Sequence, residues 1–187
     1  QSTNSTVSIE QTIEVEVAIR HPKYRLVPKY HDIGLLRLKE PIVLTTFVLP
    51  ACLPSDDHTL PSNGDTLHAA GWGRTAANQR GSSPILQKVD LPKIDNKVCS
   101  LHFQNLKKEL PLGITKDMMC AGELGKDTCK GDSGGPLVRQ LTLNNISCEH
   151  EVVGLVSFGV GCGVMGVYTR VSLYLDWITE YIAPDMT

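Results

Sequence analysis

The chain has 187 residues, of which 41% are hydrophobic, and this size and apolar content suit one ordinary domain or two small domains packed together. Its formal net charge of -2 gives no reason to expect nucleic acid or an anionic membrane as a partner. No apolar run approaches the roughly 20 residues that a bilayer-spanning helix needs.

The first third of the chain predicts strands followed by an irregular stretch. One face carries six apolar residues over positions 7–19, namely Val7, Ile9, Ile13, Val15, Val17 and Ile19, and the other face carries Ser8, Glu10, Thr12, Glu14 and Glu16. This period of two predicts a strand, or two joined strands, with one face in water. Residues 33–38 (IGLLRL) predict a short buried strand. Four prolines between residues 41 and 61 then indicate a long segment without regular structure.

The rest of the chain predicts short strands and one helix. A turn at Asn63-Gly64 precedes a strand. Further strands are predicted over residues 85–94, 150–159 and 166–171. Clear helical spacing appears only over residues 172–182, with Ser172 as the expected N-cap and Pro184 as the stop. Many short strands with one terminal helix indicate an all-β protein built from antiparallel barrels or a sandwich.

The six cysteines indicate a disulfide framework. They are Cys52, Cys99, Cys120, Cys129, Cys148 and Cys162. None forms a close Cys-x-x-Cys pair and no histidines flank them at zinc spacing, so we expect neither a metal site nor a cofactor. A scattered, even set is typical of an oxidising compartment. Glycosylation acceptor patterns that begin at Asn4 and Asn145 agree with a secreted glycoprotein.

The beginning of the chain reads as a piece of a longer protein. The stretch QSTNSTVSIE has neither a basic n-region nor an apolar h-region, and no initiator methionine precedes it. We therefore expect any signal peptide to lie upstream.

The motif GDSGGP, which starts at Gly131, is the strongest chemical signal. Gly131 and Gly134 permit a tight turn that would expose Ser133. In such a turn the N–H groups of Gly131 and Ser133 can point into one pocket and stabilise a developing oxyanion. The alternative reading of this motif alone is a glycine-rich hairpin with an incidental serine.

The stretches HDIGLLRL, AAGWGRT, CAG, DTCKGDSGGPLV and GVYTRV occur in the order typical of one family. Together they resemble the chymotrypsin/trypsin family of serine proteases over about residues 21–182. The resemblance implies a double antiparallel β-barrel with a C-terminal helix, the first barrel being incomplete. The expected parts are a partial first barrel (1–64), a second barrel (65–171), and a helix with a tail (172–187).

The resemblance also implies roles in catalysis. Ser133 matches the nucleophile, and Gly131 with Ser133 matches the pair of oxyanion-hole amides. Asp32 matches the buried acid that orients the catalytic histidine, although it could also be a turn aspartate before a strand. Asp132 matches the acid that pairs with a new N-terminal ammonium after propeptide cleavage.

The expected specificity pocket is trypsin-like. Asp127 matches the pocket floor that receives an Arg or Lys side chain. Ser157, Gly159 and Gly166 match positions in the pocket wall. One departure from the family is the segment between Cys162 and Gly166, which has only three residues and lacks the usual proline, so the rear loop is shortened.

The catalytic histidine has no counterpart in the chain. The six histidines are His21, His31, His58, His68, His102 and His150. None lies in a TAAHC-like motif upstream of Asp32, where the family carries its base. We expect the base to lie outside this chain, and the chain as written to be nearly inactive.

The resemblance pairs Cys99 with Cys120 and Cys129 with Cys162. Cys52 resembles the cysteine that tethers the family's catalytic domain to its propeptide, and Cys148 could pair with Cys52 or with a residue upstream. These features are similar to arthropod clip-domain proteases, which are secreted zymogens.

The expected function is that of an endopeptidase in an extracellular cascade, with protein substrates and protein inhibitors as partners. The alternative is an inactive homologue that binds partners. An α/β-hydrolase esterase is excluded because the alternation of strands and helices that builds that fold is absent from the sequence pattern.

Overall fold

A computed structural model describes residues 10–54, 61–141 and 150–182. The chain divides into two compact units, of which the first comprises Gln1–Arg20 and Gly34–Pro50, and the second comprises His21–Ile33 and Ala51–Thr187. None of the helices within the described ranges has the length and hydropathy required to cross a membrane. The expected glycosylation sites, Asn4 and Asn145, lie outside the described residues.

The first unit contains a two-stranded antiparallel sheet, in which β1 (Val15–Arg20) pairs with β2 (Gly34–Leu38). The expectation of a buried strand is wrong here, because no residue of β2 is buried and Leu36 is 65% exposed. Val15, on the apolar face of β1, is 47% exposed. Among the described residues, these two strands form a sheet on their own.

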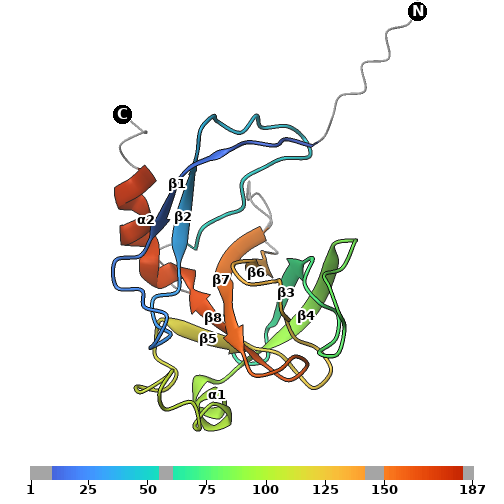
Figure 1. The fold of residues 1–187 in the computed structure, drawn as a ribbon, viewed down its shortest axis with the longest axis vertical. Helices are drawn as coiled ribbons and strands as arrows, with labels where there is room; N and C mark the ends of the chain where they lie inside the picture. Colours follow the sequence, from blue (N-terminus) through green and yellow to red (C-terminus); the bar gives the residue numbers. More distant parts are fainter. Residues whose placement is uncertain (1–9, 55–60, 142–149, 183–187) are drawn as a thin grey trace, which may run out of the picture. The chain divides into compact units, whose positions relative to one another are not determined.

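The second unit contains a closed antiparallel barrel (Figure 1). Its strands are β3 (Thr66–Gly71), β4 (Gln87–Ile94), β5 (Met118–Ala121), β6 (Pro136–Gln140), β7 (His150–Gly159) and β8 (Gly166–Arg170). Their order around the barrel is β3-β4-β5-β8-β7-β6, and closure leaves no free edge. Leu67, Leu91, Leu137 and Tyr168 are completely buried in its core. The barrel, the separate sheet and the C-terminal helix confirm the predicted trypsin-like fold class.

Two helical segments differ from the sequence prediction. Helix α1 (Asn96–His102) was not expected, and its N-cap is Asp95, whose side chain accepts a hydrogen bond of 2.7 Å from Lys97 N–H. At the C-terminus, a 3₁₀ turn (Val171–Tyr174) leads into α2 (Leu175–Ile182). Ser172 does not cap a helix, because its hydroxyl accepts from Arg170 Nε at 2.8 Å. The expected stop at Pro184 lies outside the described residues.

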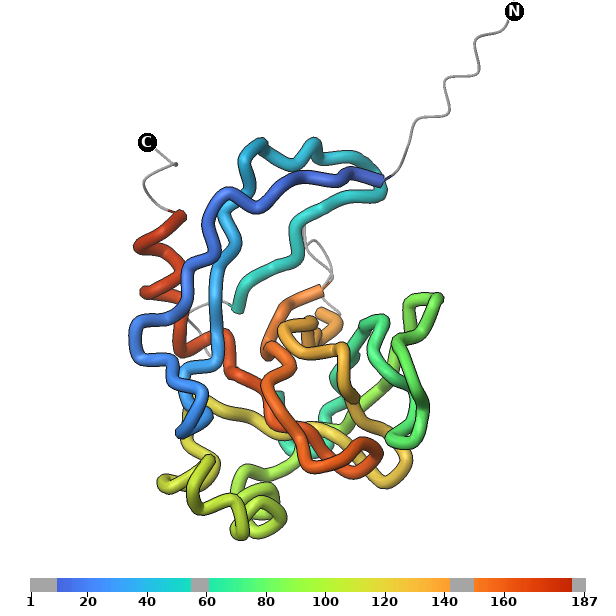
Figure 2. Tube along the Cα trace, viewed as in Figure 1, coloured from blue at the N-terminus to red at the C-terminus, as the bar shows by residue number. Residues whose placement is uncertain are grey.

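The segment His21–Ile33 is anchored to the barrel unit. Lys29 N–H donates to the carbonyl of Glu109 at 2.9 Å. Glu109 lies in the loop between α1 and β5, and Figure 2 shows the segment approaching this loop. The Tyr30 ring is buried, and its hydroxyl accepts from Leu112 N–H at 2.8 Å and lies 3.2 Å from the Gly113 carbonyl. These contacts fix the backbone that carries Asp32.

Candidate functional site

The turn that carries Ser133 is closed by three backbone hydrogen bonds. Asp132 N–H donates to Cys129 O at 3.1 Å, and Gly135 N–H donates to Asp132 O at 2.8 Å. Gly134 N–H donates to the Val156 carbonyl on β7 at 2.9 Å, which ties the turn to the barrel. Gly131 and Gly134 have φ values of 102° and 78°, a region that favours glycine. The turn leaves Ser133 exposed to solvent.

The N–H groups of Gly131 and Ser133 remain available to a ligand. Within the described parts of the chain, neither donates to a protein group, whereas the intervening Asp132 N–H is used inside the turn. Unused N–H donors beside an exposed serine hydroxyl are the kind of group from which an oxyanion site is built.

The half-buried Asp132 side chain lies in a cradle of glycines. Its Oδ1 accepts from Gly73 N–H at 2.8 Å, and its Oδ2 accepts from Cys129 N–H at 3.0 Å. A Cβ on Gly71 would lie 2.1 Å from Oδ1, and a Cβ on Gly73 would lie about 2.5 Å from the same oxygen. The glycines of the GWG stretch therefore make room for this carboxylate, a role that their sequence position alone did not reveal.

We expect Gly73→Ala to destabilise the chain by about 1–3 kcal/mol, because the added methyl would overlap the Asp132 carboxylate. Urea denaturation measures this difference in the free energy of unfolding. Gly159→Ala is the matched control, since its Cβ would meet no atom closer than 3.6 Å. Equal stability of the two variants would contradict the cradle.

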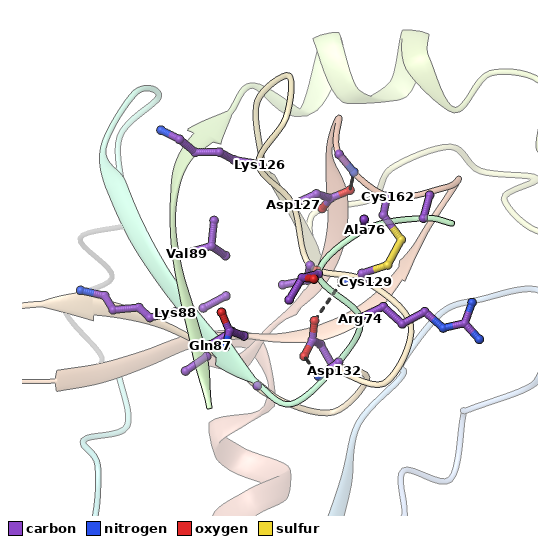
Figure 3. A pocket seen from close by; sticks show the side chains of 18 of the residues that line it. Arg74, Ala76, Gln87, Lys88, Val89, Lys126, Asp127, Cys129, Asp132 and Cys162 are labelled. Carbon is purple, nitrogen blue, oxygen red and sulfur yellow. Dashed lines mark hydrogen bonds between the residues drawn. A yellow bond between two sulfur atoms is a disulfide. The ribbon is translucent and has the colours of Figure 1, made fainter. Parts of the chain in front are cut away.

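Two cavities lie on either side of this turn. The Asp132 cavity, of about 370 Å³, is lined by the carboxylates of Asp127 and Asp132 and by Val89 of β4 (Figure 3). The Ser133 cavity, of about 430 Å³, brings together Ser133 and the three expected wall residues Ser157, Gly159 and Gly166. Residues common to both cavities are Arg74, Ala77, Thr128, Cys129 and Cys162. The cavities therefore share a wall.

Asp127 lines the Asp132 cavity and does not line the Ser133 cavity. Its Oδ2 accepts from Gly163 N–H at 3.1 Å, while its Oδ1 is buried and has no hydrogen-bond partner in the structure. Burial raises the pKa of this carboxyl, and the N–H groups of Gly163, Val164 and Thr128 partly offset the rise.

Asp32 is held next to the Ser133 cavity through Ser157. The Ser157 hydroxyl donates to Asp32 Oδ2 at 2.7 Å, and the Thr169 hydroxyl donates to the Asp32 backbone carbonyl at 2.7 Å. Because Ser157 also lines the Ser133 cavity, this contact links Asp32 to the cavity of Ser133. The half-buried carboxylate keeps Oδ1 available as a second acceptor.

The histidines in the described ranges do not line either cavity. His21 and His31 stack on each other with ring centroids 5.1 Å apart, and His31 Nδ1 lies 3.0 Å from the hydroxyl of Tyr174. Burial and the neighbouring His31 lower the pKa of His21. His68 Nδ1 lies 2.7 Å from Asp90 on the barrel surface. A serine and a carboxylate are thus in place, without a described base between them.

The structure contains the disulfides Cys99–Cys120 and Cys129–Cys162, and the second joins the Ser133 turn to the rear loop. Cys52 is also disulfide-bonded. Cys148 lies outside the described ranges. No group of metal-ligating residues occurs in the described chain.

Comparisons with known proteins agree with this geometry. The trypsin family model matches residues 1–178. The phenoloxidase-activating enzyme of Bombyx mori is 43% identical over 92% of this chain and 40% of its own length. Serine protease snk of Drosophila melanogaster is 40% identical over 95% of this chain and 40% of its own length. Trypsin II-P29 of Gallus gallus is 36% identical over 95% of this chain and 67% of its own length. The chain spans about two fifths of the length of the first two relatives. With the Ser133 turn and the closed barrel, these matches establish that the chain belongs to the trypsin family of serine proteases.

Proposed function

We propose that this protein is a serine-type endopeptidase that cleaves after Arg or Lys. The observation that carries the proposal is the arrangement around Ser157. Its hydroxyl binds Asp32, and it lines the cavity in which Ser133 is exposed beside two unused N–H donors. The proposal assigns the nucleophile, the oxyanion site and the orienting acid to this one region of the barrel unit.

In the proposed reaction, Ser133 Oγ attacks the scissile carbonyl and its proton passes to a histidine imidazole. The carbonyl oxygen becomes an oxyanion that accepts from the N–H groups of Gly131 and Ser133. Asp32 accepts from the imidazole, fixes its tautomer and stabilises the imidazolium. The imidazole then gives the proton to the leaving amine, and water repeats the sequence on the acyl-enzyme.

The base in this proposal comes from chain outside the described residues, since no described histidine lines the Ser133 cavity. The same observation favours the second candidate, a non-catalytic homologue that acts by binding partners. Intact Ser133, Asp32 and Asp127 weigh against that alternative.

Asp127 and Asp132 have separate proposed roles. Asp127 supplies the negative charge for the substrate cation, because its Oδ1 is buried and unpaired. Asp132 pairs with an α-ammonium that activation cleavage creates, which would enter the Asp132 cavity. The carboxylate already lies in that cavity, held by N–H groups of Gly73 and Cys129.

The proposed setting is extracellular proteolysis. The disulfides Cys99–Cys120 and Cys129–Cys162 fit an oxidising compartment. The silkworm relative is named for activating phenoloxidase, which supports a place among proteases that act on other proteins in a cascade. Protein substrates and protein inhibitors are the proposed partners.

The experiment that tests the proposal joins this chain to the family's histidine-bearing segment and exposes the product to a peptide library. We expect cleavage after Arg and Lys, and a loss of about 10⁶-fold in kcat for Ser133→Ala. Ser62→Ala, at an exposed loop position, is the control and should keep full activity. A folded product that binds trypsin inhibitors but cleaves nothing would favour the non-catalytic alternative.

A further inference from the structure

His21 contacts both chain neighbours of Asp32. Its backbone N–H donates to the Ile33 carbonyl at 3.1 Å, and its imidazole stacks on that of His31 with the ring centroids 5.1 Å apart. Ile33 N–H donates in turn to the His31 carbonyl at 2.9 Å, which closes a three-residue turn with Asp32 at its centre. One histidine thus holds the residue on each side of the proposed orienting acid.

The backbone of this turn is strained at His31. Its φ is 56°, and among the described residues it is the only one besides glycines with a positive φ. Such a conformation costs free energy for a residue with a side chain, so it persists only where the surroundings hold that residue. The surroundings here are the stack with His21 and a contact of 3.0 Å between His31 Nδ1 and the Tyr174 hydroxyl.

Hydrogen bonds fix the proton on each imidazole. Lys23 N–H donates to His21 Nδ1 at 3.3 Å, so this nitrogen carries no proton and the His21 ring is neutral. The Tyr174 hydroxyl donates to Asp117 Oδ2 at 3.2 Å, so its oxygen accepts from His31 Nδ1–H. His21 is therefore the ring whose contacts require the neutral form.

A proton added to His21 would enter unfavourable surroundings. It would bind Nδ1, where it would face the Lys23 N–H. Burial, His31 and Lys23 all lower the pKa of His21. The titratable or charged groups that face the stack are Lys23 of the same segment, Tyr174 of the 3₁₀ turn, and Asp117, which lies 3.9 Å from His31 Nδ1, while α2 contributes the uncharged Trp177 ring. No carboxylate in the described chain forms an ion pair with His21.

We propose that neutral His21 is a positioning residue for Asp32, and that its protonation releases the turn that carries this acid. The Asp32 carboxylate accepts from the Ser157 hydroxyl at 2.7 Å, so a shift of the turn disturbs its place beside the Ser133 cavity. The protease would then lose activity in mildly acidic solution through two protons, one on the base and one on His21. This inference rests on the proposed function of Asp32 and adds a residue that lines neither cavity.

The stability of the chain should depend on pH in the same direction. The pKa of His21 is lower in the folded chain than its ordinary value of 6.5, so the unfolded chain binds more protons near that pH. The stabilisation is complete above pH 6.5 and is lost as the pH falls from there towards the folded-state pKa.

The first test uses the 187-residue chain and needs no catalysis. Urea midpoints are measured at about pH 7.5 and about pH 5.5 for the unmodified chain and for His21→Asn, whose side-chain oxygen can accept from Lys23 N–H without titrating. The midpoint of the unmodified chain is expected to fall further on acidification. His102→Asn, at an exposed position of α1, is the control and should behave like the unmodified chain. Equal falls in the unmodified chain and in His21→Asn would overturn the inference.

Amide-proton exchange tests the turn without a variant. The protection of Ile33 N–H, corrected for its intrinsic pH dependence, is expected to fall severalfold between about pH 7.5 and about pH 5.5. Gly134 N–H, which donates to Val156 in the Ser133 turn, is the reference and should change less. The same change at both amides would contradict a release of the Asp32 turn.

The pH profile of the extended protease separates positioning from stability. At its acid end, the plot of log kcat against pH should approach a slope of two in the unmodified form and of one in His21→Asn, with KM unchanged by the substitution. A slope of one in both forms would overturn the positioning role and leave the proposed function standing. If the extended protein cleaves nothing, the proposed function fails, and the urea and exchange results decide whether His21 holds the turn.

Discussion

Asp127→Ser, in a form of the protease that includes the histidine-bearing segment, is expected to lower kcat/KM for Lys and Arg substrates by about a thousandfold. The physical reason is that the substrate cation would enter a desolvated site without its counter-ion, a loss of roughly 4 kcal/mol. Turnover of Phe substrates should change little. Steady-state kinetics with matched peptide amides measure these values.

Asp90→Ser is the control for this variant. Asp90 carries the same charge on the neighbouring strand β4, but it lies on the surface beside His68. Its removal should leave kcat/KM for all substrates unchanged. Equal turnover of Phe and Arg substrates by the unsubstituted protease would refute the assignment of Asp127.

The 187-residue chain alone is expected to hydrolyse arginine or lysine esters about 10⁴–10⁶ times more slowly than the extended form. Without an imidazole, nothing removes the Ser133 proton, and loss of one triad member has an effect of this size in subtilisin. No described histidine lines the Ser133 cavity. His21 and His31, the described histidines nearest in sequence to Asp32, stack on each other, and His31 also contacts the Tyr174 hydroxyl. Ester hydrolysis by equal amounts of the two proteins measures the difference.

The parts of the fold that could be predicted are those in which a local pattern determines the structure. Strand β7 occupies the predicted residues 150–159, because its continuous apolar run is bounded by turn residues. The exposed turn at Ser133 could be predicted because its glycines adopt positive φ values. Helix α1 was missed, since it has only seven residues and its start depends on a cap at Asp95.

The parts that could not be predicted depend on contacts between distant segments. The exposure of Leu36 depends on what covers the β1–β2 sheet, and a strand pattern does not contain that information. The cradle of Asp132 joins residues 59 positions apart, and the Gly163 contact with Asp127 joins residues 36 positions apart. The sequence marked the rear loop as short, but only the structure places its amide on a carboxylate oxygen.

We propose Ser133 as the nucleophile of a trypsin-type site whose base lies outside the described residues. Its most direct test is the rate at which an organophosphate labels the chain alone and the chain extended with the histidine-bearing segment, with the labelled residue identified by mass spectrometry. We expect stoichiometric labelling of Ser133 in the extended form, no labelling of its Ser133→Ala variant, and labelling of the chain alone slower by a factor of at least about 10³. Equally fast labelling of Ser133 in the chain alone would show that one of its own histidines is the base, and labelling of another residue would show that Ser133 is not the nucleophile.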